Sequence, residues 1–239
     1  MTMTDIQNSG SQNDRSVALD QYRRRAWIYD LELAAFEPVR QSAVARLGLS
    51  RGQTVLDVGC GTGLSFKLLQ DQVGPDGVII GIEQCPEMIE LARQQVARNG
   101  WSNVTLLCMP VEDADIPVTA DAALFHFTHD ILRNRSALDN VCRHLRPQAH
   151  VVAAGLQWAQ PWAWPVNFFV LCAAMHSVST LQGLNEPWSE LTAFTDGLDV
   201  QAMMAGGVFV ASGLRSAPRK ATPRRSKKLT VIKVGAGVG

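Results

Sequence analysis

The sequence has no Cys-x-x-Cys pair, only one lysine (Lys67) before residue 215, and no apolar run long enough to cross a bilayer. Its five cysteines, at positions 60, 85, 108, 142 and 172, stand far apart, which argues against a disulfide framework or a zinc site and favours free thiols in a reducing cytoplasm. The most apolar segment, residues 162–175, is shorter than the roughly 20 residues of a transmembrane helix. The polar N-terminus lacks the apolar core of a secretory signal. These absences predict a soluble, cytoplasmic protein without a metal site.

The chain has 239 residues, of which 46% are hydrophobic, enough for one domain with a buried core. Residues 215–239 contain eight basic residues and no acidic one, which leaves 14 basic and 22 acidic residues, a net charge of −8, in the rest of the chain. We expect residues 215–239 to be a disordered basic tail, residues 1–16 to be disordered as well, and residues 17–214 to form the domain. Such a tail can bind nucleic acid or anionic lipid, although a solvated extension is the simpler interpretation, and the acidic domain argues against nucleic acid.

Helical and strand-like patterns alternate along the chain. Residues 17–48 repeat apolar side chains at helical spacing, with Pro38 expected to divide the helix and Gly48 to end it. The pattern then changes to short, nearly continuous apolar runs, which are typical of parallel strands buried on both faces. These runs lie at residues 54–59, 77–83, 104–109, 121–127 and 149–155.

Helical segments separate these expected strands at residues 64–73, 85–100 and 136–147. Ser136 is the expected cap of the third helix, and Pro147 its expected end. The alternation predicts a doubly wound α/β sheet with helices on both faces. Residues 198–213 contain two strand-like runs around Gly206 and Gly207, which indicates a closing antiparallel hairpin.

Three glycines, Gly59, Gly61 and Gly63, follow the first expected strand directly. Glycine permits a tight turn and lets a ligand approach the backbone, and ligands of open α/β sheets bind where the first strand enters the first helix. Glu83 ends the next expected strand, where a carboxylate can accept hydrogen bonds from both hydroxyls of a ribose. The glycine spacing is G-x-G-x-G, with Leu64 where a dinucleotide fold has its third glycine, and no P-loop lysine follows. The pattern therefore indicates a nucleoside cofactor other than a dinucleotide or a nucleoside triphosphate.

The stretches "VLDVGCGTG", "GIEQCPEMIELAR" and "LRPQAHVVAAG" resemble the successive motifs of class I S-adenosylmethionine-dependent methyltransferases, and the resemblance runs from about residue 20 to 214. The resemblance implies a Rossmann-like seven-stranded sheet with strand 7 antiparallel, and S-adenosylmethionine as cofactor, with S-adenosylhomocysteine as product. Asp57 and the backbone of Gly59–Gly63, including Cys60, would hold the methionine part, and Glu83 the ribose. Gln84, Val111, Glu112 and Phe127 would complete the cofactor site, with Pro110 standing where the family often has an adenine-reading Asp or Asn.

The end of the fourth expected strand supplies the candidate catalytic residues. His129 is the preferred general base, because imidazole titrates near neutrality, and capping of the following turn is the alternative role. His126 lies within the apolar strand and is assigned either to the substrate site or to the core. In relatives, the segment before the domain often folds over the cofactor, which would bring Tyr22 and Tyr29 to the sulfonium or the acceptor; packing of that helix on the domain is the alternative.

Residues 158–188 are too long for a simple connection and are interpreted as an apolar lid over the acceptor. Its Trp158, Trp162, Trp164 and Phe168 would line the acceptor pocket. The favoured function is methyl transfer to an oxygen or nitrogen of a small, largely apolar or aromatic acceptor. The alternatives are a phospholipid-headgroup N-methyltransferase or a quinone C-methyltransferase with a peripheral membrane contact, since tryptophans favour that depth, and a non-catalytic cofactor-binding partner protein. No N/D-P-P-Y signature of nucleobase methyltransferases is present.

Overall fold

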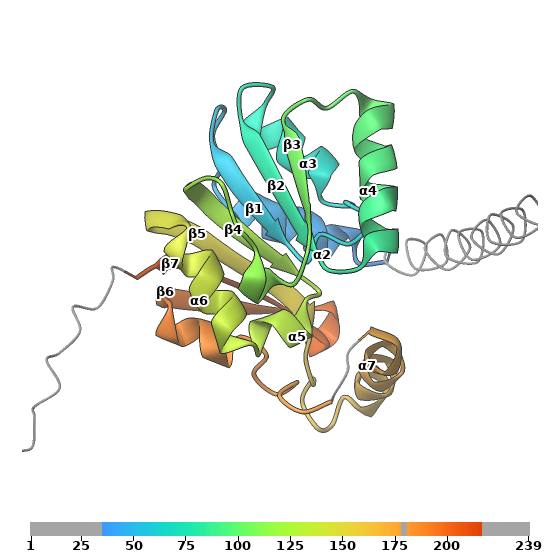
Figure 1. The fold of residues 1–239 in the computed structure, drawn as a ribbon. Helices are drawn as coiled ribbons and strands as arrows, with labels where there is room; N and C mark the ends of the chain where they lie inside the picture. The colour runs from blue at the N-terminus through green and yellow to red at the C-terminus, as the bar shows by residue number, and fades with distance from the viewer. Residues whose placement is uncertain (1–34, 178–180, 217–239) are drawn as a thin grey trace, which may run out of the picture.

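The computed structural model describes residues 35–177 and 181–216 (Figure 1). They form a seven-stranded sheet in the order β3-β2-β1-β4-β5-β7-β6. The strands are β1 (Thr54–Val58), β2 (Val78–Glu83), β3 (Val104–Cys108), β4 (Ala120–His126), β5 (Leu145–Leu156), β6 (Thr195–Met203) and β7 (Val208–Arg215). The expectations about residues 1–34, and all of those about the tail beyond residue 216, lie outside the described residues.

β7 is the antiparallel strand of the sheet. β1 pairs in parallel with β2 and β4, β2 with β3, and β4 with β5. β7 lies between β5 and β6 and is antiparallel to both. The expected fold class, a Rossmann-like sheet with strand 7 antiparallel, is confirmed, and so is the hairpin, which turns at the short 3-10 helix η3 (Met204–Gly206).

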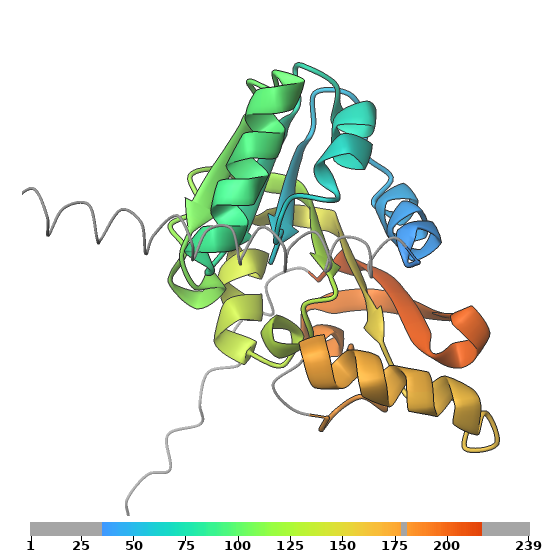
Figure 2. The same cartoon turned by 90° about the vertical axis from the view of Figure 1, so that its right-hand side faces the viewer.

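Helices cover both faces of the sheet (Figures 1 and 2). One face packs against α2 (Glu37–Arg46), α3 (Phe66–Val73), α4 (Pro86–Asn99) and α7 (Trp164–Ser177). The other face packs against α5 (His129–Leu132), α6 (Arg135–Arg143) and the 3-10 helices η1 (Val111–Asp113) and η2 (Ser189–Ala193). The central strand β1 is buried along four of its five residues, as the continuous apolar pattern predicts.

The third expected helix is shorter than predicted. α6 ends at Arg143, and β5 begins at Leu145, before the proline that was expected to end the helix. The cap is Asn134 and not Ser136, because Asn134 Oδ1 accepts hydrogen bonds from the backbone N–H groups of Ser136, at 3.0 Å, and Ala137, at 3.2 Å. Pro147 sits where the pairing of β5 with β4 is interrupted, so its missing N–H costs the ladder little.

Candidate active site

A cleft of about 380 Å³ lies at the carboxyl ends of β1, β2 and β4. This volume is typical of small-molecule sites, and this edge of an open α/β sheet is where ligands bind. The walls come from the loop after β1, the end of β2 with the start of α4, η1, and the loop after β4. They include Gly59, Gly61, Glu83, Met88, Val111 and Phe127.

The three glycines of the loop after β1 have different structural roles. A Cβ on Gly59 would lie 2.4 Å from Thr128 Cγ2, so this glycine lets the loop pack against the segment after β4. A Cβ on Gly63 would lie 2.6 Å from the ring of Phe66, so Gly63 serves the entry into α3, and it lines none of the cavities at this edge. Among the described residues, nothing lies within 4 Å of a Cβ built on Gly61, which has φ +55°. Gly61 is therefore the position where the backbone is open to a ligand.

Glu83 is held in the cleft by two backbone N–H groups. Its Oε2 accepts a hydrogen bond from Gly61 at 3.2 Å, and its Oε1 accepts one from Cys85 at 2.9 Å. A carboxylate has about four acceptor sites, so this one can still accept two hydroxyl hydrogens. The loop itself is tied to β2, because Gly59 and Cys60 both donate to the Ile82 carbonyl. The predicted ribose acceptor thus faces the predicted glycine loop.

η1 forms the far wall of the cleft. Val111 is buried and Glu112 is exposed, and both line the cleft together with Gln84. The buried side chain of Asn140 on α6 holds η1 in place by donating to the carbonyls of Val111, at 2.8 Å, and Ala114, at 2.9 Å. Asn140 has a positioning role that no pattern in the sequence indicated.

A smaller, polar cavity adjoins the cleft at Gly59, Gly61, His126 and Phe127. Asp57 and Arg40, on β1 and α2, line it and are 2% and 3% exposed. Arg40 pairs with Glu37, yet within the described part of the chain its Nε and Nη2 atoms, Asp57 Oδ2 and His126 Nε2 are buried without a hydrogen-bond partner. Buried polar atoms without partners are rare in native structures and indicate a ligand or water.

Burial shifts the titration of this polar group. It raises the pKa of Asp57 to about 7, with the Arg40 charge acting against the shift and the Glu83 charge adding to it. Burial, helped by the Arg40 charge, lowers the pKa of His126 to about 3. His126 is therefore neutral across the physiological range. Arg40 was missed in the sequence because it lies within an ordinary helical pattern, 17 positions before Asp57.

Phe127 lines all three cavities at this edge of the sheet. It follows β4, has φ +57°, which is rare for a bulky residue, and lines the cleft, the polar cavity and a third, apolar recess. The ring of Phe127 packs edge-on against that of Phe36, with centroids 4.8 Å apart, and Phe36 in turn packs against Phe169 of α7. Strained backbone at such a place is typical of functional sites.

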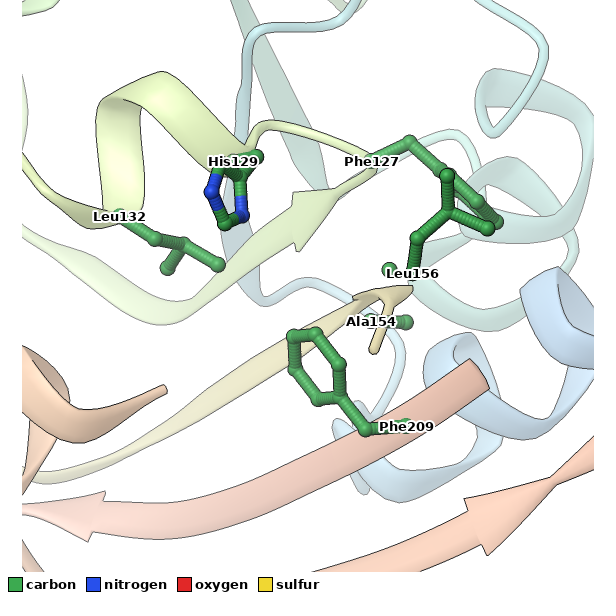
Figure 3. A pocket seen from close by; sticks show the side chains of 7 residues that line it. Phe127, His129, Leu132, Ala154, Leu156 and Phe209 are labelled. Atoms are coloured by element: carbon green, nitrogen blue, oxygen red, sulfur yellow. The ribbon is translucent and has the colours of Figure 1, made fainter. Parts of the chain in front are cut away.

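The apolar recess lies beneath His129, between the ends of β4, β5 and β7 (Figure 3). Leu132, Leu156 and Phe209 line it with Phe127, and its volume of about 10 Å³ holds one water-sized group. His129 is 7% exposed and lines both the recess and the cleft. The two candidate residues at the end of β4, His126 and His129, are thus brought to the same edge, but only His129 faces the recess.

The predicted lid side chains do not line these cavities. Trp162, Trp164 and Phe168 are 81%, 73% and 64% exposed, and Trp158 packs against the core. The reason is that α7 packs through Val170 and Ala174, so its opposite side faces outward. Tyr22 and Tyr29 lie outside the described residues. Within the described ranges, no three His, Cys, Asp or Glu side chains are grouped as a metal site, and no helix has the length and apolar character to cross a membrane.

Comparison with known proteins places these features in a family. A methyltransferase-domain family profile matches residues 49–183. An arsenite methyltransferase of Halobacterium salinarum is 33% identical over 138 residues, which are 56% of this chain and 33% of the relative. An aklanonic acid methyltransferase of Streptomyces sp. is 32% identical over 113 residues, 47% of this chain and 50% of that protein. The chain therefore spans a third to a half of the length of these curated relatives.

The solved structures agree with the fold. The N-methyltransferase NodS of Bradyrhizobium japonicum, crystallised with S-adenosylhomocysteine, has a TM-score of 0.55 at 18% identity, covering 76% of this chain and 88% of its own. The family profile matches more than half of the present chain, and the sheet has the seven strands and the antiparallel strand 7 expected of the fold. The chain belongs to the class I S-adenosylmethionine-dependent methyltransferases.

Proposed function

We propose that the protein transfers a methyl group from S-adenosylmethionine to an oxygen or nitrogen atom of a small, largely apolar or aromatic acceptor. The observation that carries this proposal is the contact between two cavities: a cleft with a glycine loop and a carboxylate meets an apolar recess at Phe127 and His129. The first fits a nucleoside cofactor, and the second, with a volume of about 10 Å³, fits one methyl-sized apolar group of the acceptor.

The residues of the cleft fit the cofactor. Gly61 leaves its backbone open, and the Glu83 carboxylate can accept hydrogen bonds from the ribose. The amino-acid end of the cofactor carries a carboxylate and an ammonium group. The unpaired Arg40 nitrogens match the first, and the unpaired Asp57 oxygen matches the second. The adenine would then lie along Gln84, Val111 and Glu112. A backbone N–H or the Glu112 carboxylate would contact the adenine in place of the Asp or Asn that the family often has there.

S-adenosylmethionine supplies a methyl group that is already activated by its sulfonium. The protein's contribution is then to orient the acceptor, exclude water and take up a proton where the acceptor must lose one. We assign the proton uptake to His129, which faces both the cleft and the recess. His126 is a poor candidate for this role, because its low pKa makes it a weak base.

The recess supports the acceptor class. Its lining of Phe127, Leu132, Leu156 and Phe209 has no polar side chain apart from His129. Relatives carry names that indicate chemically different acceptors, arsenite and aklanonic acid among them. The apolar lining favours an acceptor that places an apolar group at the recess, and this supports the proposal of a largely apolar or aromatic acceptor. The cytoplasmic location expected from the sequence remains part of this proposal.

The test combines cofactor binding with an acceptor screen. Calorimetry should show binding of S-adenosylhomocysteine, and tritiated S-adenosylmethionine should label phenols or aryl amines in preference to arsenite. Labelling of arsenite alone would overturn the acceptor class. Cofactor binding with no labelled acceptor in the panel would favour the alternative of a non-catalytic cofactor-binding protein.

A further inference from the structure

α7 is apolar on both of its sides, although only one of them is covered. Val166, Val170 and Ala174, four residues apart, pack on the core. The opposite side, here called the outer face of α7, consists of Trp162 just before the helix, Trp164, Phe168 and Met175; the last three follow helical spacing. The four side chains are 81%, 73%, 64% and 71% exposed. A helix that is apolar all round is normally buried, so the outer face indicates a missing partner.

The helix is fixed in this orientation. A Cβ on Gly207 would lie 2.8 Å from Val166 and 3.1 Å from Val170, so the β6–β7 hairpin is shaped to receive the inner side. Asn167 Oδ1 accepts a hydrogen bond from the backbone N–H of Ala159 at 2.8 Å and so holds the first turn. Both views show α7 at the periphery of the molecule (Figures 1 and 2). The outer face therefore cannot turn inward without breaking these contacts.

The chemistry of the outer face favours a lipid surface over a protein. Residues 157–185 contain no Asp, Glu, Lys or Arg. Protein interfaces carry a polar rim and about one hydrogen bond per 100–200 Å², for which this face offers few groups. Tryptophan prefers the membrane–water interface, where its ring is in an apolar layer and its N–H stays hydrated.

The sequence also supplies a second membrane signal. Residues 215–239 carry eight basic residues and no acidic one, in contrast to the acidic domain. Basic segments are attracted to anionic headgroups, and stable peripheral binding normally needs two signals, one apolar and one electrostatic. The segment begins at Arg215, the last residue of β7.

We propose that the outer face of α7 docks on an anionic membrane surface by inserting Trp162, Trp164 and Phe168 into the headgroup region, with anionic lipid favoured by the basic composition of residues 215–239. The proposal does not depend on methyl transfer, since vesicle binding and cofactor binding are measured separately.

The test is flotation of the full-length protein with vesicles of phosphatidylcholine, with and without phosphatidylglycerol. A triple variant with Trp162→Gln, Trp164→Gln and Phe168→Gln should lose binding by about tenfold or more, because three apolar side chains no longer enter the lipid. The matched control is Leu181→Gln with Met204→Gln, two other exposed apolar residues, which should bind like the wild type. A variant with Gln at Arg219, Lys220, Arg224, Arg225, Lys227 and Lys228 should lose only the gain from phosphatidylglycerol.

Two results would overturn the proposal. One is a wild-type protein that floats with neither kind of vesicle. The other is a triple variant that floats like the wild type while it binds S-adenosylhomocysteine normally, which shows that it is folded. If the wild type instead forms a concentration-dependent dimer that the triple variant lacks, and does not float, a second copy of the chain covers this face.

Discussion

The Nε2 atom of His129 lies 3.2 Å from the backbone oxygen of Gln182. A carbonyl oxygen only accepts, so Nε2 carries the hydrogen and the lone pair of the neutral ring is on Nδ1. The Gln182 oxygen also accepts from Arg133 at 2.7 Å, which ties the chain after α7 to α5. The imidazole is thereby held in one tautomer, with Nδ1 as the basic atom, and nitrogen-15 NMR of the side chain can check this assignment.

Replacing His129 tests its role as a base. His129→Asn should lower kcat by about 100-fold or more, the usual scale for loss of a general base, with little effect on the affinity for S-adenosylhomocysteine. His150→Asn is the control, because His150 is exposed in the middle of β5 and lines none of the three cavities. Full turnover in the His129 variant would leave orientation of the acceptor as the main source of catalysis.

Glu83 is expected to contribute through its charge. Glu83→Gln should weaken the affinity for S-adenosylhomocysteine by about tenfold or more, because the ribose hydroxyls lose a charged acceptor. Glu87→Gln removes a carboxylate four positions further on, outside the cleft lining, and should leave the affinity unchanged. Calorimetry measures the affinity of both variants for S-adenosylhomocysteine. If the Glu83→Gln variant binds as tightly as the Glu87→Gln variant, the ribose does not bind at Glu83.

Gly61 can be tested against a glycine of similar backbone conformation. Gly61 and Gly100 have φ of +55° and +67°, and within the described residues a Cβ on either would meet nothing within 4 Å. Alanine should therefore cost each variant a similar stability, about 1–2 kcal/mol. Only Gly61→Ala should weaken cofactor binding, because its methyl group would occupy the ligand's space. Similar affinities in the two variants would mean that no ligand approaches Gly61.

Asp57 should make cofactor binding depend on pH. With a pKa of about 7, Asp57 is half protonated near neutrality in the free protein. The ammonium of the cofactor favours the carboxylate, so binding should lower this pKa, release a proton, and weaken as the pH falls through about 7. Calorimetry in buffers of different ionisation enthalpy measures the proton release. A wild type that releases no proton, or an Asp57→Asn variant with the same pH dependence, would contradict this prediction.

The same carboxyl should affect the stability of the free protein. Its pKa is raised from 3.8 to about 7 on folding, so the folded state binds the proton more tightly than the unfolded state. The free energy of unfolding should therefore fall as the pH rises between these two values. Thermal unfolding of wild type and Asp57→Asn over this range measures the effect. The decrease in the free energy of unfolding that Asp57 causes should be absent from the variant. If the free energy of unfolding depends on pH in the same way in both proteins, the pKa of Asp57 is not raised.

Local patterns were enough to predict most of the fold. The continuous apolar runs located the parallel strands, and the Gly206–Gly207 pair located the hairpin, because both signals depend on near neighbours in the chain. The start of β5 was wrong, since Pro147 was interpreted as the end of a helix although it lies inside the strand at a break in its pairing. A proline alone does not distinguish these two roles.

The site was harder to predict where it depends on contacts between distant segments. The glycine loop and Glu83 are close in sequence, and the structure places both in the cleft. The placement of Arg40 and Asp57 in one cavity depends on how α2 packs against the sheet. The outward side of α7 also follows from helix packing, which a periodic apolar pattern does not specify when both sides of a helix are apolar. Trp162 was therefore assigned to an enclosed pocket, whereas the structure exposes it.

The strand order also has a consequence for synthesis. β6 is made before β7, yet β7 lies between β5 and β6 and is the partner to which β6 is hydrogen-bonded. While the chain grows from the ribosome, β1 to β5 can assemble in the order in which they appear, but β6 must wait unpaired until β7 has emerged. During that interval the edges of β5 and β6 are exposed to pairing with other chains. Truncation before residue 208 should therefore yield an aggregating chain, and not a smaller soluble domain.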